Sequence, residues 1–256
     1  MGIEIKAIHS FLVNFLKEQF SKSGFKKAVI GLSGGVDSAV SFSLAVEALG
    51  KDNVLAVMMP YKSSSPESIA HAQQIAKQLG VRSVLVDITP MAEEFKKLLP
   101  DLDRVRLGNV LARLRMITLY DFSAKENALV IGTSNKTEIL LGYGTLFGDT
   151  ACAINPLGDL YKTQVWELAK ELGVPVDIIN KTPSADLWVG QTDEGELGFL
   201  YNDVDKLFVE MIDNARSDDE LFALGFDKEF VVQVRNRIRT NEFKRRLPVI
   251  AVLPKI

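Results

Sequence analysis

The chain has 256 residues, of which 47% are hydrophobic and 25% charged, so it can bury the core of one large domain or two small ones. Its formal net charge of −3 gives no sign of a nucleic-acid surface, and no apolar run reaches membrane-spanning length. The single cysteine, Cys152, excludes an intrachain disulfide and a cysteine-rich metal site. Without a signal-peptide core at the N-terminus, the sequence predicts a cytoplasmic protein with neither nucleic-acid nor membrane partners.

Strand and helix patterns alternate over the first 173 residues. The chain begins with apolar residues at helical spacing, which predict an amphipathic helix over residues 3–21. Short apolar runs bounded by turn residues predict buried strands at 28–30, 54–59, 84–88 and 128–131, with a possible fifth at 151–154. Helix patterns lie between and after them, at 38–49, 66–79, 91–99, 107–120 and 164–172.

This order predicts an α/β fold, a doubly wound parallel sheet of about five strands with helices on both faces. Two more helices are expected over residues 200–215 and 230–240, and residues 1–256 are expected to form a single domain. Periodicity is lost from 181 to 198, where prolines, glycines and acidic residues are typical of a mobile surface loop. We expect residues 188–198 to be disordered without ligand and to close over it.

A glycine turn joins the first strand to the first helix of the sheet, at Gly31, Leu32, Ser33, Gly34, Gly35, Val36, Asp37 and Ser38. Free N–H groups and the positive end of the helix dipole then point into one hollow, which makes an anion site. The segment lacks the Lys-Ser/Thr pair of a Walker loop, and its glycines are wrongly spaced for a dinucleotide fingerprint. The alternative is an ordinary turn rich in small residues.

Two carboxylates follow different predicted strands. Asp37 follows the first strand and Glu138 follows the fourth, and these strands are good candidates to flank the point where the strand order reverses. Both carboxylates would then face one phosphate, an arrangement that suits Mg²⁺. The alternatives are a helix N-cap for Asp37 and an exposed helix charge for Glu138.

The six residues Ser-Gly-Gly-Val-Asp-Ser at 33–38 resemble the signature of the ATP pyrophosphatases. Three later segments, at 132–149, 155–163 and 183–187, resemble in order the remaining motifs of ammonia-dependent NAD⁺ synthetases. The resemblance covers nearly the whole chain. It implies amidation of deamido-NAD to NAD⁺ with ammonia, through an adenylate formed from ATP with release of pyrophosphate and then AMP.

The resemblance also implies roles for particular residues. Asp37, Asp149 and Lys162 would be catalytic, with Asp149 receiving or orienting ammonia, and Mg²⁺ would lie on Asp37 and Glu138. Arg113, Asp149, Phe243 and Lys244 would contact deamido-NAD. Besides residues 31–38, the ATP site would include Thr133, Lys162 and Ser184. A homodimer is implied, with the helix over 107–120 near the shared surface.

Two positions depart from the pattern. Leu146 and Ala153 stand where many bacterial relatives have a lysine and an aspartate that contact deamido-NAD, so we expect a different dinucleotide pocket. Rival assignments are another ATP pyrophosphatase, such as a GMP synthetase or a tRNA thiolase, and a nucleotide-binding sensor without turnover. Because Cys152 has no histidine nearby in sequence and the synthetase motifs leave no room for a glutaminase domain, we expect use of free ammonia only.

Overall fold

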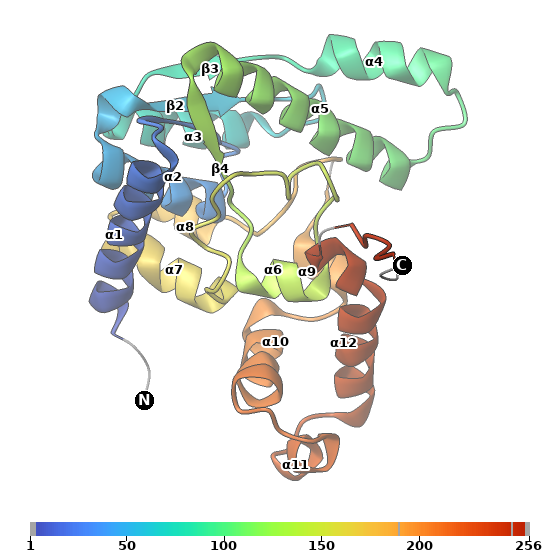
Figure 1. Ribbon diagram of the computed structural model, residues 1–256. Coiled ribbons are helices and arrows are strands. Elements are labelled where there is room, and N and C mark those ends of the chain that lie inside the picture. Colours follow the sequence, from blue (N-terminus) through green and yellow to red (C-terminus); the bar gives the residue numbers. More distant parts are fainter. Residues whose placement is uncertain (1–3, 189, 247, 254–256) are drawn as a thin grey trace.

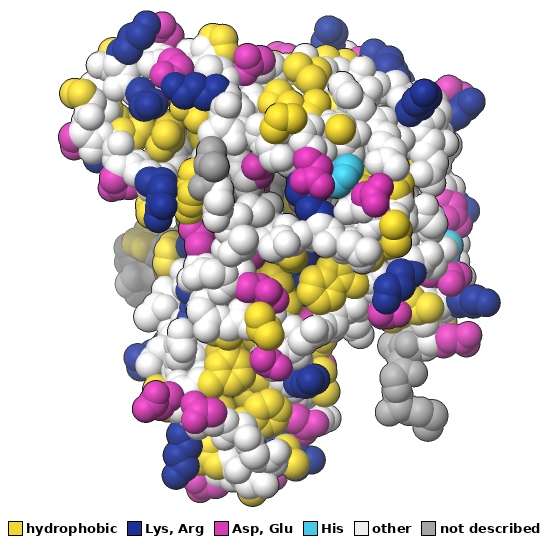
Figure 2. All heavy atoms as spheres, turned by 180° about the vertical axis from the view of Figure 1, so that it is seen from behind, with side chains coloured by type: hydrophobic (Ala, Val, Ile, Leu, Met, Phe, Trp, Pro, Cys, Tyr) yellow, Lys and Arg dark blue, Asp and Glu magenta, His cyan; other side chains and the backbone are white. Residues whose placement is uncertain are grey.

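The computed structural model describes residues 4–188, 190–246 and 248–253. Four parallel strands form the sheet, in the order β3-β2-β1-β4 (Figure 1). The strands are β1 (Lys27–Gly31), β2 (Val54–Met58), β3 (Ser83–Leu85) and β4 (Ala128–Ile131). The C-terminal helices project below the sheet as a separate lobe in both overall views (Figures 1 and 2). Acidic and basic side chains are interspersed over the face drawn in Figure 2.

The helices follow the predicted order with shifted ends. The α-helices are α1 (Ile5–Ser23), α2 (Val36–Leu49), α3 (Pro66–Gln78), α4 (Thr89–Leu98), α5 (Arg104–Glu126), α6 (Lys136–Leu141), α7 (Lys162–Glu171), α8 (Val176–Asn180), α9 (Asp193–Leu197), α10 (Tyr201–Phe208), α11 (Asp218–Ala223) and α12 (Lys228–Thr240). Short 3₁₀ segments cover Lys51–Asn53 and Glu242–Arg245, and a π-helical turn covers Val209–Asp213.

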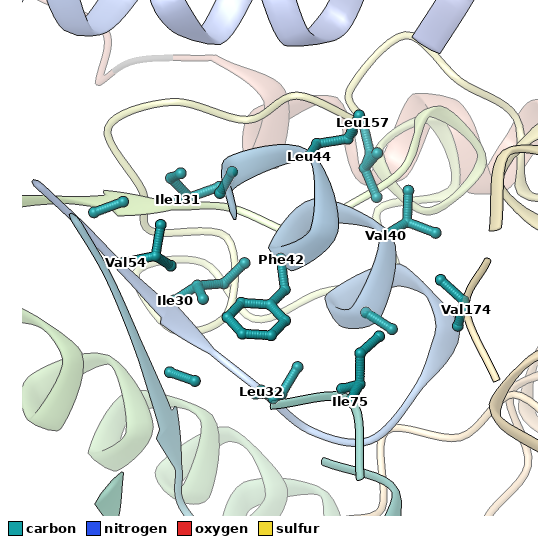
Figure 3. Close-up of a cluster of buried hydrophobic side chains, with 14 of the residues drawn as sticks. Ile30, Leu32, Val40, Phe42, Leu44, Val54, Ile75, Ile131, Leu157 and Val174 are labelled. Carbon is teal, nitrogen blue, oxygen red and sulfur yellow. The ribbon is translucent and has the colours of Figure 1, made fainter. Parts of the chain in front are cut away.

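The main core lies between the sheet and the layer of α1, α2, α3 and α7. Side chains alternate along β1, so Ala28 and Ile30 point into this core while Val29 faces the other side. Helix α2 supplies the centre of the core with Val40, Phe42 and Leu44 (Figure 3). Helix α5 covers the opposite face of β1 and β4. The prediction of helices on both faces is therefore confirmed.

The strand order reverses beside β1. The chain passes from β1 to β2 to β3 on one side and then returns to place β4 on the other side of β1. The loops that follow β1 and β4 therefore meet at one edge, as the sequence predicts.

The expected fifth strand is wrong. Residues 151–154 make only one isolated bridge, Ile154 with Ile131, although Ala153 N–H donates to the Val130 carbonyl at 2.9 Å. Pro156 has no N–H to extend a ladder, and residues 142–150 reach this point through turns rather than a crossover helix.

The C-terminal lobe has a core of its own, formed mainly by apolar side chains of α10, α11 and α12. The helix expected over 200–215 is divided into α10 and the π-helical turn. Disorder is expected for 188–198, but residues 193–197 form helix α9, capped by Thr192 and anchored by buried Leu197, so the expectation is wrong for that part. Residue 189 lies outside the described residues. Among the helices described, none combines the length and apolarity needed to cross a bilayer.

Candidate active site

A cavity of about 450 Å³ lies at the carboxyl ends of the strands, beside the β1–β4 junction. The loops after β1 and β4, helix α5 and the segments 142–151 and 181–196 contribute to its lining. Most of the predicted site residues line it: Gly31, Leu32, Ser33, Gly35, Val36, Asp37, Ser38, Thr133, Glu138, Asp149, Lys162, Ser184 and Lys244. The structure therefore brings together residues that are up to 213 positions apart in sequence, from Gly31 to Lys244.

The turn before α2 has the geometry of an anion loop. Gly35 is the N-cap of α2 and supplies no side chain, so the first N–H groups of the helix remain available to a ligand. Ser38 Oγ donates to the Gly35 carbonyl at 2.9 Å and accepts from Ser33 N–H at 3.2 Å, which closes the turn. Gly34 has φ +80°, and a Cβ there would lie 2.0 Å from the Ser68 carbonyl oxygen, so only glycine fits.

Two carboxylates converge on one ammonium group beside this loop. Lys162 Nζ forms an ion pair with Asp37 Oδ2 and lies 3.7 Å from Glu138 Oε1. The lysine is 1% exposed, at the first position of α7. Asn135 holds the same two acids from the other side, with Nδ2 donating to Asp37 Oδ1 at 2.9 Å and the backbone N–H to Glu138 Oε2 at 3.2 Å. The Asp37 side chain therefore does not cap helix α2, which was the alternative role for it.

The pKa values of both Glu138 and Lys162 are raised, for different reasons. Burial raises the pKa of Glu138 well above its ordinary value, and the neighbouring Asp37 carboxylate raises it further. Burial by itself lowers the pKa of Lys162, but the carboxylates of Asp37 and Glu138 outweigh it and leave that pKa raised. Lys162 is therefore charged at neutral pH and is held by both acids.

A second acidic pair lies next to the first. Asp193 is 4% exposed and accepts hydrogen bonds from Tyr143 Oη at 2.9 Å and Tyr201 Oη at 3.2 Å. Tyr143 Oη also lies 2.8 Å from Glu196 Oε2. Helix α9, which carries both acids, thus forms part of the cavity wall.

Residues 181–188 form another wall and are tied to the start of α3. Asp186, which has φ +51°, accepts from Ser65 N–H at 3.0 Å and from Ser68 Oγ at 3.1 Å. Lys181 Nζ donates to the same serine hydroxyl at 2.6 Å. Ser184 accepts from the Asp186 N–H at 3.1 Å and lines the cavity.

Among the residues expected to contact deamido-NAD, two lie inside and two outside the cavity lining. Asp149 accepts from Thr145 N–H at 2.8 Å, and Lys244 donates to the carbonyls of Gly142 and Gly144. Arg113 and Phe243 are exposed and do not line the cavity. Arg113 instead donates to the Leu146 carbonyl at 3.2 Å.

Helix geometry explains why Arg115, rather than Arg113, reaches the cavity. Residues two apart on a helix point about 200° apart, so only one of the two arginines faces inward. Arg115 lines the cavity and donates to the Met59 carbonyl at 3.1 Å. Burial lowers the pKa of its guanidinium, and Asp186 and Asp149 partly offset that effect.

Sequence reasoning missed several polar groups of the site: Asn135, Tyr143, Lys181, Asp186 and Asp193, besides Arg115. Five of these, all except Arg115, stand in loops or at their ends, where no periodicity indicates which way a side chain points. The only signal was their position inside or next to the segments that resemble family motifs.

Asp37 and Glu138 fit a magnesium site that the nucleotide completes. No three His, Cys, Asp or Glu side chains in the described part of the chain form a ready-made metal cluster. Mg²⁺, however, commonly takes only one or two protein carboxylates together with substrate phosphates. The two acids are brought within reach of one ammonium group beside the anion loop, so one cation of that size can be shared between them.

The fold and the cavity define an α/β protein with an anion loop and an acid–lysine cluster at the switch of strand order, which is the arrangement of a nucleotide site. The family model for NAD synthase matches residues 8–248, and the chain belongs to this family.

Similar proteins agree with that membership. The NH(3)-dependent NAD(+) synthetase of Trichlorobacter lovleyi is 54% identical over 98% of this chain and 92% of its own. The solved NMN synthetase of Francisella tularensis has a TM-score of 0.88 and 34% identity, covering 98% of this chain and all of that one. An NH3-dependent NAD synthetase from Campylobacter jejuni, solved with a nitrate ion, has a TM-score of 0.84 and 35% identity over 98% of this chain.

One buried acid outside the cavity lining joins the elements that carry the site. Asp205 on α10 accepts from Thr137 Oγ1 on α6 at 2.5 Å and from Thr163 N–H on α7 at 2.8 Å. Burial raises the pKa of Asp205, although both hydrogen bonds favour its charged form. A group whose pKa is higher in the folded than in the unfolded state stabilises the fold most at pH values below its unfolded pKa. This stabilisation is lost as the pH rises through the folded-state pKa.

We therefore expect the stability of Asp205→Asn, relative to that of the wild type, to increase as the pH rises. The free energy of unfolding of the variant minus that of the wild type should become more positive as the pH rises above the ordinary aspartate pKa of about 4. Urea unfolding at a series of pH values measures it. Asp87→Asn is the control, because Thr89 holds the pKa of Asp87 below its usual range, so its trend should have the opposite sign and lie below about pH 4. A pH-independent difference for Asp205→Asn would contradict the expectation.

Proposed function

We propose that this chain is an ammonia-dependent NAD⁺ synthetase, a carbon–nitrogen ligase that amidates deamido-NAD at the expense of ATP. The observation that carries the proposal is the convergence of the anion loop at 33–38 with Asp37, Glu138 and Lys162 in one cavity. A chain that only sensed nucleotides would have little need for two carboxylates and a buried ammonium at that edge. Residues 1–256 would act as one domain.

The chemistry has two steps, since a carboxylate must be activated before it can acylate ammonia. The nicotinate carboxylate attacks the α-phosphorus of ATP, the bond to the β-phosphate oxygen breaks, and pyrophosphate leaves. Ammonia then attacks the acyl carbon and AMP leaves with the bonding pair. The N–H groups at the start of α2, together with Thr133 and Ser184, would bind phosphate and nucleotide, and Lys162 would offset charge on the leaving group.

Asp37 and Glu138 would hold Mg²⁺, which neutralises phosphate charge when bound. Asp149 would orient ammonia at the acyl centre, and with Lys244 it would contact the nicotinate nucleotide. Arg113 and Phe243 lie outside the cavity. They would contact a bound dinucleotide only where the half that is farther from the reacting carboxylate extends beyond the edge of the cavity. A cytoplasmic location stays a prediction from the sequence.

The second candidate product is nicotinamide mononucleotide, made from the mononucleotide acid by the same chemistry. Leu146 and Ala153 lack the polar groups that contact deamido-NAD in many relatives, and Arg113 and Phe243 do not line the cavity. With fewer contacts to the second nucleotide, deamido-NAD would bind with less advantage in affinity over the mononucleotide acid. The name of the Francisella tularensis protein concerns this product, whereas the curated relatives at about half identity are NAD(+) synthetases, so the dinucleotide remains the first candidate.

Product identification tests both candidates and the nitrogen source. The purified chain is incubated with ATP, Mg²⁺ and either deamido-NAD or nicotinate mononucleotide, with ammonium chloride or glutamine. We expect NAD⁺ to form with the higher kcat/KM, and only with ammonium. Burial raises the pKa of the Cys152 thiol, and His9 and His71 lie beside Glu47 and Glu67, so no activated cysteine is available for glutamine. No amide product from either acid would refute the proposal, and equal rates with glutamine would refute the ammonia requirement.

The acids that face the loop should be essential for adenylation. Asp37→Asn and Glu138→Gln each remove one carboxylate while retaining size, and we expect pyrophosphate release to fall at least about a hundredfold with the fold intact. The matched control is Glu220→Gln, because Glu220 occupies the same capping-box position in α11, away from the cavity. Near-normal release in both site variants at ordinary Mg²⁺ would exclude the assignment.

We also propose a homodimer whose interface includes α5. Val105, Ile117 and Tyr120 on this helix are 63%, 55% and 42% exposed, and Leu98 at the end of α4 is 78% exposed. Ile117→Glu should shift the protein from dimer to monomer in sedimentation velocity at micromolar concentration, while Phe11→Glu, at an exposed position of α1, should not. A wild-type chain that sediments only as a monomer would contradict this.

A further inference from the structure

Asn135 contacts both acids, and none of the proposed chemical steps uses it. Its residue is fully buried, in the loop between β4 and α6. The side-chain oxygen accepts from Glu138 N–H at 2.9 Å, and Nδ2 donates to Asp37 Oδ1 at 2.9 Å. The amide orientation is fixed, because only the oxygen can meet the Glu138 N–H. With the backbone N–H on Glu138 Oε2, this one residue contacts both carboxylates.

The loop that carries Asn135 is itself held on both sides. Gly132 N–H donates to the Ile154 carbonyl at 2.8 Å, and Asn155 Nδ2 donates to the Ser134 carbonyl at 2.9 Å. Lys136 N–H donates to the Leu160 carbonyl at 2.7 Å. Asn135 therefore cannot follow a displaced carboxylate without breaking these bonds, so it can impose a position on the acids.

The side chain does more than cap a helix. An N-cap requires only an acceptor for the N–H at the third helical position, and Asp or Ser supplies that acceptor as well as Asn does. Capping does not use the Nδ2 donor of Asn135. This group instead donates to Asp37, a residue of another helix. We propose that Asn135 is a positioning residue that sets the separation and orientation of Asp37 and Glu138 for a divalent cation. The inference rests on the proposed function.

The test separates the cap from the carboxylate contact. Asn135→Ser retains a capping oxygen and removes the donor to Asp37, whereas Asn135→Asp retains size and cap but places a third carboxylate beside Asp37. Mn²⁺ binding is measured by electron paramagnetic resonance on the full chain with α,β-methylene-ATP, which cannot release pyrophosphate. We expect the Mn²⁺ Kd to rise at least about tenfold in both variants, and more in Asn135→Asp. Affinity for the analogue in EDTA should be unchanged in Asn135→Ser.

Two controls set the scale. Asp37→Asn defines the loss expected when a ligand itself is removed, and Ser217→Ala removes the cap of α11, which has the same capping box away from the cavity. Ser217→Ala should lower the melting temperature without changing the Mn²⁺ Kd. An Mn²⁺ Kd within about twofold of wild type in Asn135→Ser would overturn the proposal, as would failure of both Asn135 variants to fold, which would make the residue structural. Because no amide is formed in this assay, its result is independent of the product test above.

Discussion

The buried ion pair between Lys162 and Asp37 is the interaction on which the arrangement of this site depends. A charged group removed from water costs several kcal/mol unless partners replace the lost hydration. Lys162 is almost inaccessible and finds those partners in Asp37 on α2 and Glu138 on α6, while its own backbone N–H is held by Thr137. Three helices from different parts of the chain therefore begin at one point. An amide in place of either acid would still offer Lys162 an oxygen, but without the charge of the ion pair.

The sheet makes that meeting possible. Because β1 and β4 are neighbours while the chain between them forms β2, β3 and α5, the loops after both strands open at the same edge. This much was predictable, since continuous apolar runs such as residues 28–30 and 128–131 indicate strands buried on both faces and glycine or polar residues mark their ends. The anion loop, both acids and most of the ATP-site residues could thus be located from sequence.

What sequence could not predict depends on orientation and on contacts distant along the chain. Arg113 and Arg115 are equivalent as residue types, and only the packing of α5 decides which one faces the cavity. Ile154 has strand character, yet pairing stops after one bridge because the following proline cannot continue it. The acidic stretch at 193–197 lacks apolar periodicity but folds as α9, because Thr192 caps it. Two tyrosine hydroxyls, from α10 and from the loop after α6, donate hydrogen bonds to the buried Asp193.

The charge balance of the cavity explains why a cation and a polyanionic substrate should enter together. On one wall Asp37, Glu138 and Asp193 share a single ammonium, that of Lys162, and burial raises the pKa of both Glu138 and Asp193. A triphosphate brought to the anion loop beside these acids would be repelled by them. A divalent cation between acids and phosphates reverses the sign of that interaction. Because Lys162 is paired with Asp37 and lies beside Glu138, a cation that binds these two acids has to compete with that ammonium for them.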